Sequence, residues 1–72
     1  MDFSLLTEDQ LKKFEELGVK SQHSTTWSSE QIADAYIITN ILYGLNKSDT
    51  GCTSCRRGTI DLLKKAYRTK NN

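Results

Sequence analysis

The chain has 72 residues, a length that allows one domain spanning residues 1–72 with a small core. Hydrophobic residues make up 36% of the sequence and charged residues 26%, which excludes a disordered charged tail. No apolar run approaches the roughly 18 residues that a membrane span requires, so we expect no membrane partner. The N-terminus lacks the pattern of a signal peptide, and we therefore expect a cytoplasmic protein.

The formal net charge of +1 conceals an asymmetry along the chain. Residues 1–51 contain eight acidic and four basic residues, a net charge of −4, whereas residues 52–72 contain one acidic and six basic residues, a net charge of +5. A chain polarised in this way is suited to self-association or to binding a partner of opposite charge.

The first predicted helix covers about residues 8–17. Thr7 and Gln10 have the spacing of a capping box, in which each side chain bonds the backbone N–H of the other residue. Apolar residues then recur at helical spacing. Gly18 follows, and a glycine there suits the left-handed conformation that ends many helices.

The second predicted helix covers about residues 28–44 and begins with the same capping chemistry, at Ser28 and Gln31. Gly44 marks its end. β-Branched residues in this segment also suit a strand, but the capping box and the length favour a helix. Its apolar residues cover most of the helix circumference: Ile32, Ala33, Ala35, Tyr36, Ile37, Ile38, Ile41, Leu42, Tyr43 and Leu45. Such a helix is buried or meets a partner, and we expect that two short neighbours leave part of it uncovered.

The third predicted helix covers about residues 53–69, after a turn cluster at 46–51. At about 100° per residue, one face groups mainly apolar residues: Cys52, Cys55, Thr59, Leu62, Leu63 and Ala66. Basic residues lie on the opposite side. Three helices with short polar connections predict an all-α fold, a small three-helix bundle (about 8–17, 28–44 and 53–69).

The most distinctive stretch is the Cys-x-x-Cys pair, Cys52 and Cys55, at the start of the third helix. One interpretation is that both are small apolar residues on the inner face. A second is a zinc site, for which His23 is the available third nitrogen or sulfur ligand. A third is a redox-active or structural disulfide, since a helix N-terminus and the adjacent Arg56 and Arg57 favour the thiolate.

The Gly-Cys-x-x-Cys-Arg-Arg run that opens the third helix resembles small helical proteins encoded by bacteriophages. The resemblance covers the last third of the chain. It implies a viral structural protein, a component of the virion or of its assembly, located in the host cytoplasm or in the virion.

No phosphate-binding glycine loop, metalloprotease motif or paired-carboxylate motif is present, so we predict a protein that is not an enzyme. The predicted function is protein–protein interaction, by self-association or with a protein partner, through the apolar second helix and the oppositely charged ends. The expected interaction residues are aromatic or strongly apolar: Trp27, Tyr36, Ile37, Tyr43 and Tyr67.

The alternative prediction is a small nucleic-acid-binding module that uses the basic third helix. Its candidate contacts are Arg56, Arg57, Lys64 and Arg68. The second and third helices, joined by about six residues, would then imitate a helix-turn-helix.

Overall fold

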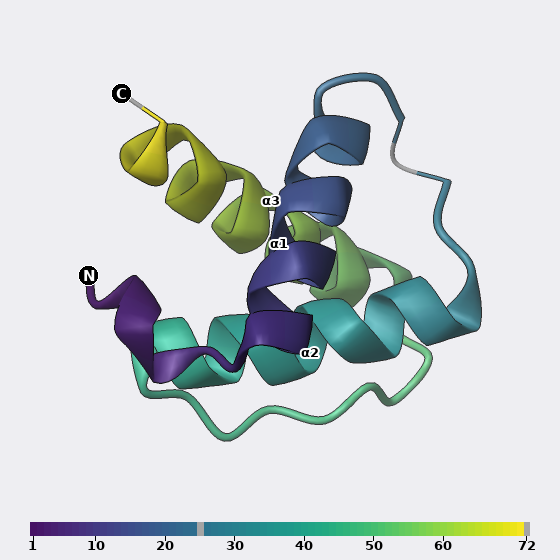
Figure 1. Cartoon of the computed structure of the whole chain (residues 1–72). Coiled ribbons are helices and arrows are strands. Elements are labelled where there is room, and N and C mark those ends of the chain that lie inside the picture. Colours follow the sequence, from purple (N-terminus) through teal and green to yellow (C-terminus); the bar gives the residue numbers. More distant parts are fainter. Residues whose placement is uncertain (25, 72) are drawn as a thin grey trace.

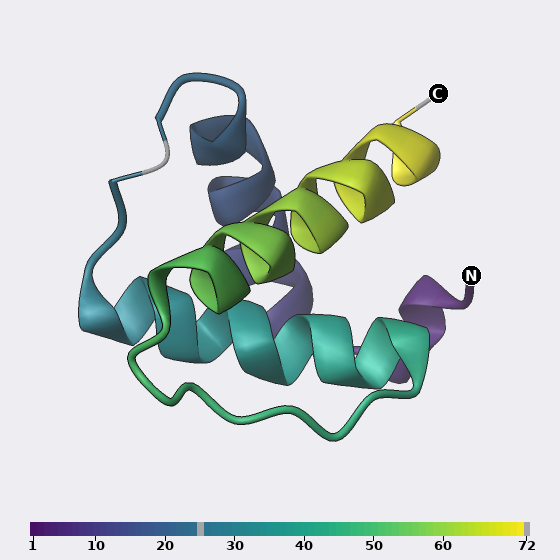
Figure 2. The ribbon, with the colours of Figure 1, turned by 180° about the vertical axis from the view of Figure 1, so that it is seen from behind.

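The computed structural model describes residues 1–24 and 26–71. Within these residues it contains helices and no strands, which confirms the all-α three-helix bundle. The elements are a short 3-10 helix and three α-helices: η1 (Phe3–Leu5), α1 (Glu8–Ser21), α2 (Ser29–Tyr43) and α3 (Thr53–Lys70). Helices α1 and α3 cross each other on one side of α2, and the connector 44–52 runs back along α2 to the start of α3 (Figures 1 and 2).

Both predicted capping boxes are confirmed. The Thr7 hydroxyl accepts a hydrogen bond from the backbone N–H of Gln10 at 3.2 Å, and the Gln10 side chain accepts one from the Thr7 N–H at 3.0 Å. Ser28 and Gln31 make the equivalent bonds at 3.1 and 2.9 Å. Gly44 closes α2 in the left-handed conformation with a φ of 65°, also as predicted.

Gly18 has a different role from the one predicted. Helix α1 continues through it to Ser21, and Gly18 is buried in the last turn of the helix. A β-carbon at this position would overlap the Cγ and Cδ1 atoms of the Tyr67 ring, which lies directly against the α1 backbone. The glycine is therefore explained by the close approach of α3 and not by a left-handed turn.

The core lies where the three helices meet. Phe14, Leu63 and Ala66 are fully buried between α1 and α3, and Ile38 of α2 is 1% exposed beneath them. The Tyr67 ring packs edge-on against Phe14, with ring centroids 6.0 Å apart. A second, smaller cluster contains Ile32, Tyr36 and Ile60, with Trp27 packed against it.

The expectation that its neighbours leave part of α2 uncovered is confirmed only for a narrow stripe, because η1, α1 and α3 all pack on this helix. The buried positions of α2 are Ile32, Ala35, Tyr36, Ile38, Thr39 and Leu42. Thr39 satisfies its hydroxyl by donating to the Ala35 carbonyl at 2.8 Å. A narrow stripe of apolar surface remains, and its central residue, Ile37, is 49% exposed.

Among the described residues, no helix combines the length and the apolarity required to cross a membrane.

Candidate functional site

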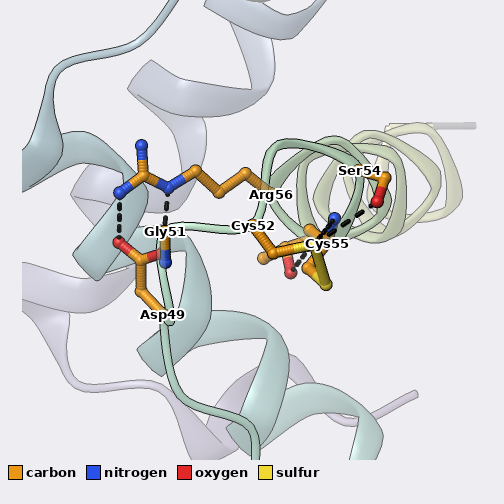
Figure 3. The surroundings of a disulfide bond; sticks show 7 residues. Asp49, Gly51, Cys52, Ser54, Cys55 and Arg56 are labelled. Carbon is orange, nitrogen blue, oxygen red and sulfur yellow. Dashed lines mark hydrogen bonds and ion pairs between the residues drawn. A yellow bond between two sulfur atoms is a disulfide. The ribbon is translucent and has the colours of Figure 1, made fainter.

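The N-terminal turn of α3 carries a disulfide between Cys52 and Cys55 (Figure 3). Cys52 is the N-cap residue, and its Sγ accepts a hydrogen bond from the Cys55 backbone N–H at 3.2 Å. The Ser54 hydroxyl lies 3.3 Å from the same sulfur. The pair is thus held at the positive end of the helix dipole.

The interpretation of these cysteines as inner-face apolar residues is wrong. Cys55 is exposed and Cys52 is half-buried. The buried residues of α3 begin only at Thr59, so the first turn projects beyond the core. Helical periodicity places a residue on a face, but it does not show whether another element covers that face.

The predicted zinc ligands do not come together in the described part of the chain. There, no three His, Cys, Asp or Glu side chains lie close enough together to hold a metal ion. His23, the predicted third ligand, follows α1 in an exposed position, and both cysteine sulfurs are used by the disulfide.

Side-chain hydrogen bonds hold the connector before the disulfide at two points. Asn40 of α2 donates from its side-chain amide to the Lys47 carbonyl at 2.9 Å and accepts from the Lys47 N–H at 3.2 Å. Further along, both carboxylate oxygens of Asp49 accept hydrogen bonds from the Arg56 guanidinium at 2.9 Å, and the Gly51 N–H donates to one of them at 3.0 Å (Figure 3). The bonds from Arg56 are the main reason that the pKa of Asp49 lies below its ordinary value.

The basic residues of α3 fall into two groups. Arg56 is engaged by Asp49, and Lys70 pairs with Glu15 of α1 at 2.7 Å. The others lie on or beside the surface that we call the α3 outer face, which consists of the exposed residues Arg57, Gly58, Asp61, Lys65 and Arg68. Lys64 borders this face and is half-buried.

The connection between α2 and α3 is longer than predicted. It occupies residues 44–52 and follows α2 in an extended path, whereas the sequence suggested about six residues and a helix-turn-helix. The turn in that motif has about 3–4 residues, so the expected likeness is not found.

Most of the predicted interaction residues are engaged within the fold. Tyr36 is only 5% exposed, and Tyr67 covers Gly18. The half-buried Trp27 donates its indole N–H to the Ser24 carbonyl at 3.1 Å. Tyr43 donates its hydroxyl to the Leu62 carbonyl at 2.8 Å, and burial raises the pKa of the Tyr43 phenol.

Ile37 is the predicted interaction residue that remains widely open to solvent. It lies between Ala33, which is exposed, and Ile41, which is half-buried, and we call these three residues the α2 outer stripe. The apolar pattern of α2 alone does not distinguish this stripe from the rest of the helix. Its i, i+4, i+8 spacing, opposite the positions that became buried, is the signal that identifies it.

An open hollow of about 450 Å³ lies beside the disulfide, between α2, the connector and α3. Tyr36, Lys47, Ser54, Cys55 and Gly58 are among the residues that line it. It brings a cysteine and a lysine, well separated in the sequence, to the same concave surface.

Comparisons with known protein families, with curated proteins and with solved structures find no match to this chain.

Proposed function

We propose that the protein is a non-enzymatic interaction module that associates with a second copy of itself. In this contact the α2 outer stripe of one copy packs against the α3 outer face of the next. The observation that carries the proposal is the α2 outer stripe, a continuous apolar strip in which Ile37 is 49% exposed between the exposed Ala33 and the half-buried Ile41.

Charge complementarity favours α3 as the occupant of this stripe. Helix α2 contains Glu30 and Asp34 and no basic residue, and Asp34 also pairs with Lys13 of α1 at 3.6 Å. The α3 outer face contains Arg57, Lys65 and Arg68 against one acidic residue, Asp61, a net charge of +2, because Arg56 and Lys70 are paired with Asp49 and Glu15 within the chain. Two copies of α2 placed face to face would bring like charges together, whereas α2 against α3 pairs opposite charges.

The shape of the α3 outer face suits close contact. A β-carbon at Gly58 would meet no atom within 4 Å, so the helix backbone is accessible at this position. The neighbouring Lys65 and Arg68 are exposed, and their aliphatic stems can cover an apolar residue while their charged ends reach the acidic residues of α2.

A contact between two different faces is heterologous, and repeating it generates rings or filaments. This property is consistent with a role as a component of a virion or of its assembly, which the resemblance to phage proteins implies. It also requires no bound cofactor and no catalytic group.

Sedimentation velocity over a range of protein and salt concentrations tests the proposal. The wild-type chain is expected to self-associate, and more weakly as salt rises, because screening weakens the opposite-charge contacts. Ile37→Glu is expected to abolish the association. Val19→Glu is the matched control, because Val19 is also 49% exposed but lies on α1, outside both faces. A wild-type chain that stays monomeric at high concentration would contradict the proposal.

Mixing two defective variants tests which faces meet. Ile37→Glu lacks a working α2 outer stripe, and Lys65→Glu combined with Arg68→Glu lacks a working α3 outer face. Each variant alone is expected to be monomeric, and the mixture to form a dimer through the two intact faces. If the α3 variant still self-associates, the contact is made by α2 alone and the head-to-tail arrangement is wrong.

A second candidate is nucleic-acid binding through α3, favoured by the outward position of Arg57, Lys65 and Arg68. An electrophoretic mobility shift measured against salt tests it. Arg57→Glu with Arg68→Glu would abolish such binding, whereas Ile37→Glu would leave it unchanged. Self-association, by contrast, is expected to be lost in Ile37→Glu.

A further inference from the structure

The Cys52–Cys55 disulfide combines exposure with a polarised environment. We propose that it is a thiol–disulfide exchange site, at which a small anionic thiol attacks the Cys55 sulfur and Cys52 leaves as a thiolate. This inference is independent of self-association, because it rests on the first turn of α3 and on the hollow beside it.

The position of Cys52 makes its sulfur the better leaving group. Cys52 is the N-cap residue, and its Sγ accepts a hydrogen bond from the Cys55 backbone N–H at 3.2 Å. The Ser54 hydroxyl oxygen lies 3.3 Å from the same sulfur. Both are groups that can donate to a negatively charged sulfur, and the helix dipole acts in the same direction. Thiol–disulfide exchange is faster when the departing thiolate is stabilised in this way.

The position of Cys55 makes its sulfur the point of attack. Cys55 is exposed and lines the hollow of about 450 Å³, whereas Cys52 is half-buried and is not among the lining residues. The hollow is open enough to admit a small thiol.

Lys47 gives the hollow a preference for an anionic reactant. Lys47 lines the hollow together with Cys55. The carboxylate of Asp49, nearby in the sequence, is engaged by the Arg56 guanidinium (Figure 3) and is not among the residues that line the hollow. A thiol that carries carboxylates, such as glutathione, therefore meets a positive charge on its approach to Cys55.

The exchange balances with two equivalents of the thiol. The first thiolate forms a bond to the Cys55 sulfur, the Cys52–Cys55 bond breaks, and Cys52 keeps the electron pair. A second thiolate then attacks the external sulfur of the mixed disulfide. The small-molecule disulfide departs, and the Cys55 sulfur takes up a proton from water. Two thiols are oxidised and the protein disulfide is reduced.

The fold is expected to persist through this cycle. The buried residues of α3 begin at Thr59, and the disulfide closes a loop within one helical turn. Reduction therefore changes the chemistry of the first turn and leaves the crossing of α1 and α3 in place.

Trapping the mixed disulfide tests the direction of attack. The oxidised full-length chain is treated with limiting reduced glutathione, quenched with iodoacetamide and analysed by peptide mass spectrometry. Glutathione is expected on Cys55 and the alkyl group on Cys52. Glutathione on Cys52, or a disulfide that survives millimolar glutathione unchanged, would overturn the proposal.

The thiolate absorbance at 240 nm tests the leaving group. In Cys55→Ser the remaining cysteine, Cys52, keeps its backbone N–H donor. In Cys52→Ser the remaining cysteine, Cys55, has no such donor from this turn. At pH 7 the thiolate fraction is expected to be severalfold larger in Cys55→Ser. Adding Ser54→Ala should lower that fraction, whereas adding the matched control Thr53→Ala should not. Equal fractions in the two single-cysteine variants would contradict the assignment.

Comparing thiols of opposite charge tests the role of Lys47. Wild-type protein is expected to react severalfold faster with glutathione than with cysteamine at low salt. Lys47→Gln should remove most of this difference without altering the helical circular dichroism signal. A preference that is unchanged in Lys47→Gln would show that the hollow does not select an anionic thiol.

Discussion

Two glycines that both lie inside helices show how differently two regions of this molecule are built. Gly18 of α1 is buried, with the Tyr67 ring occupying the place where a β-carbon would project. Gly58 of α3 faces open space, with no atom within 4 Å of the equivalent point. The first glycine is required by packing, whereas at the second a β-carbon would have room and the glycine weakens its helix.

The same contrast extends to the regions around the two glycines. The crossing of α1 and α3 is apolar and closely packed, and it contains Phe14 and Leu63, both fully buried. The N-terminal half of α3 is polar on its outer side and holds the disulfide and the Asp49–Arg56 pair. The crossing of α1 and α3 therefore contributes most of the stability, and the N-terminal half of α3 is available for contact with other molecules.

The largest expected effect is at the crossing itself. Phe14→Ala removes a fully buried ring that contacts both Phe3 and Tyr67. We expect a loss of about 3–5 kcal/mol in the free energy of unfolding, measured by urea denaturation, because a cavity replaces the ring. A loss below about 1 kcal/mol, the effect typical of a surface site, would break the distinction between the two regions.

Replacing each of the two glycines by alanine is expected to change the free energy of unfolding in opposite directions. Gly18→Ala should destabilise the fold by about 1–3 kcal/mol, because the new methyl group forces the Tyr67 ring to move. Gly58→Ala should stabilise it by up to about 1 kcal/mol, the helix-propensity difference between the two residues. Urea denaturation measures both changes. Two changes of the same sign would contradict the difference in packing, and Tyr67→Ala should relieve the penalty at Gly18.

Tyr43→Phe is expected to have an intermediate effect, since it removes the hydroxyl that donates to the Leu62 carbonyl. We expect a loss of about 1 kcal/mol at neutral pH. Because burial raises the pKa of Tyr43 in the folded state, the wild-type chain loses stability as the pH rises above about 10. The difference between wild type and Tyr43→Phe should therefore shrink at alkaline pH, and a difference that stays constant would contradict the burial of this phenol.

The smallest effect is expected in the connector. The pKa of Asp49 is lowered in the folded state. The Asp49–Arg56 pair therefore contributes its full stability at pH values above the ordinary carboxyl pKa, and this contribution is lost as the pH falls through the lowered pKa. The Gly51 amide, which donates to Asp49, should report this titration by NMR. In Asp49→Asn the amide shift should no longer follow an acidic titration, while the helices remain unchanged. A Gly51 shift that still titrates in this variant would show that another carboxylate holds the connector.

The helix starts were predictable because their chemistry is local. Thr7 and Gln10, or Ser28 and Gln31, satisfy each other within one turn, so four residues are enough to recognise the start. The end of α2 at Gly44 follows from the same short-range logic. The candidate site could not be predicted from short-range sequence patterns in the same way. The Cys-x-x-Cys pair stands out in the sequence, but its exposure and its neighbour Lys47 depend on how the connector is routed.

The sequence by itself determined the number of α-helices, where each of them begins, and the separation of acidic and basic residues along the chain, but not the short 3-10 helix η1. The tertiary structure decided that Gly18 stays helical, that α2 is covered by its own neighbours and that Ile37 remains open. Caps and charges act over a few residues, so they can be recognised in the chain. Burial depends on which distant element crosses a given face, and that is decided only when α1, α2 and α3 pack together.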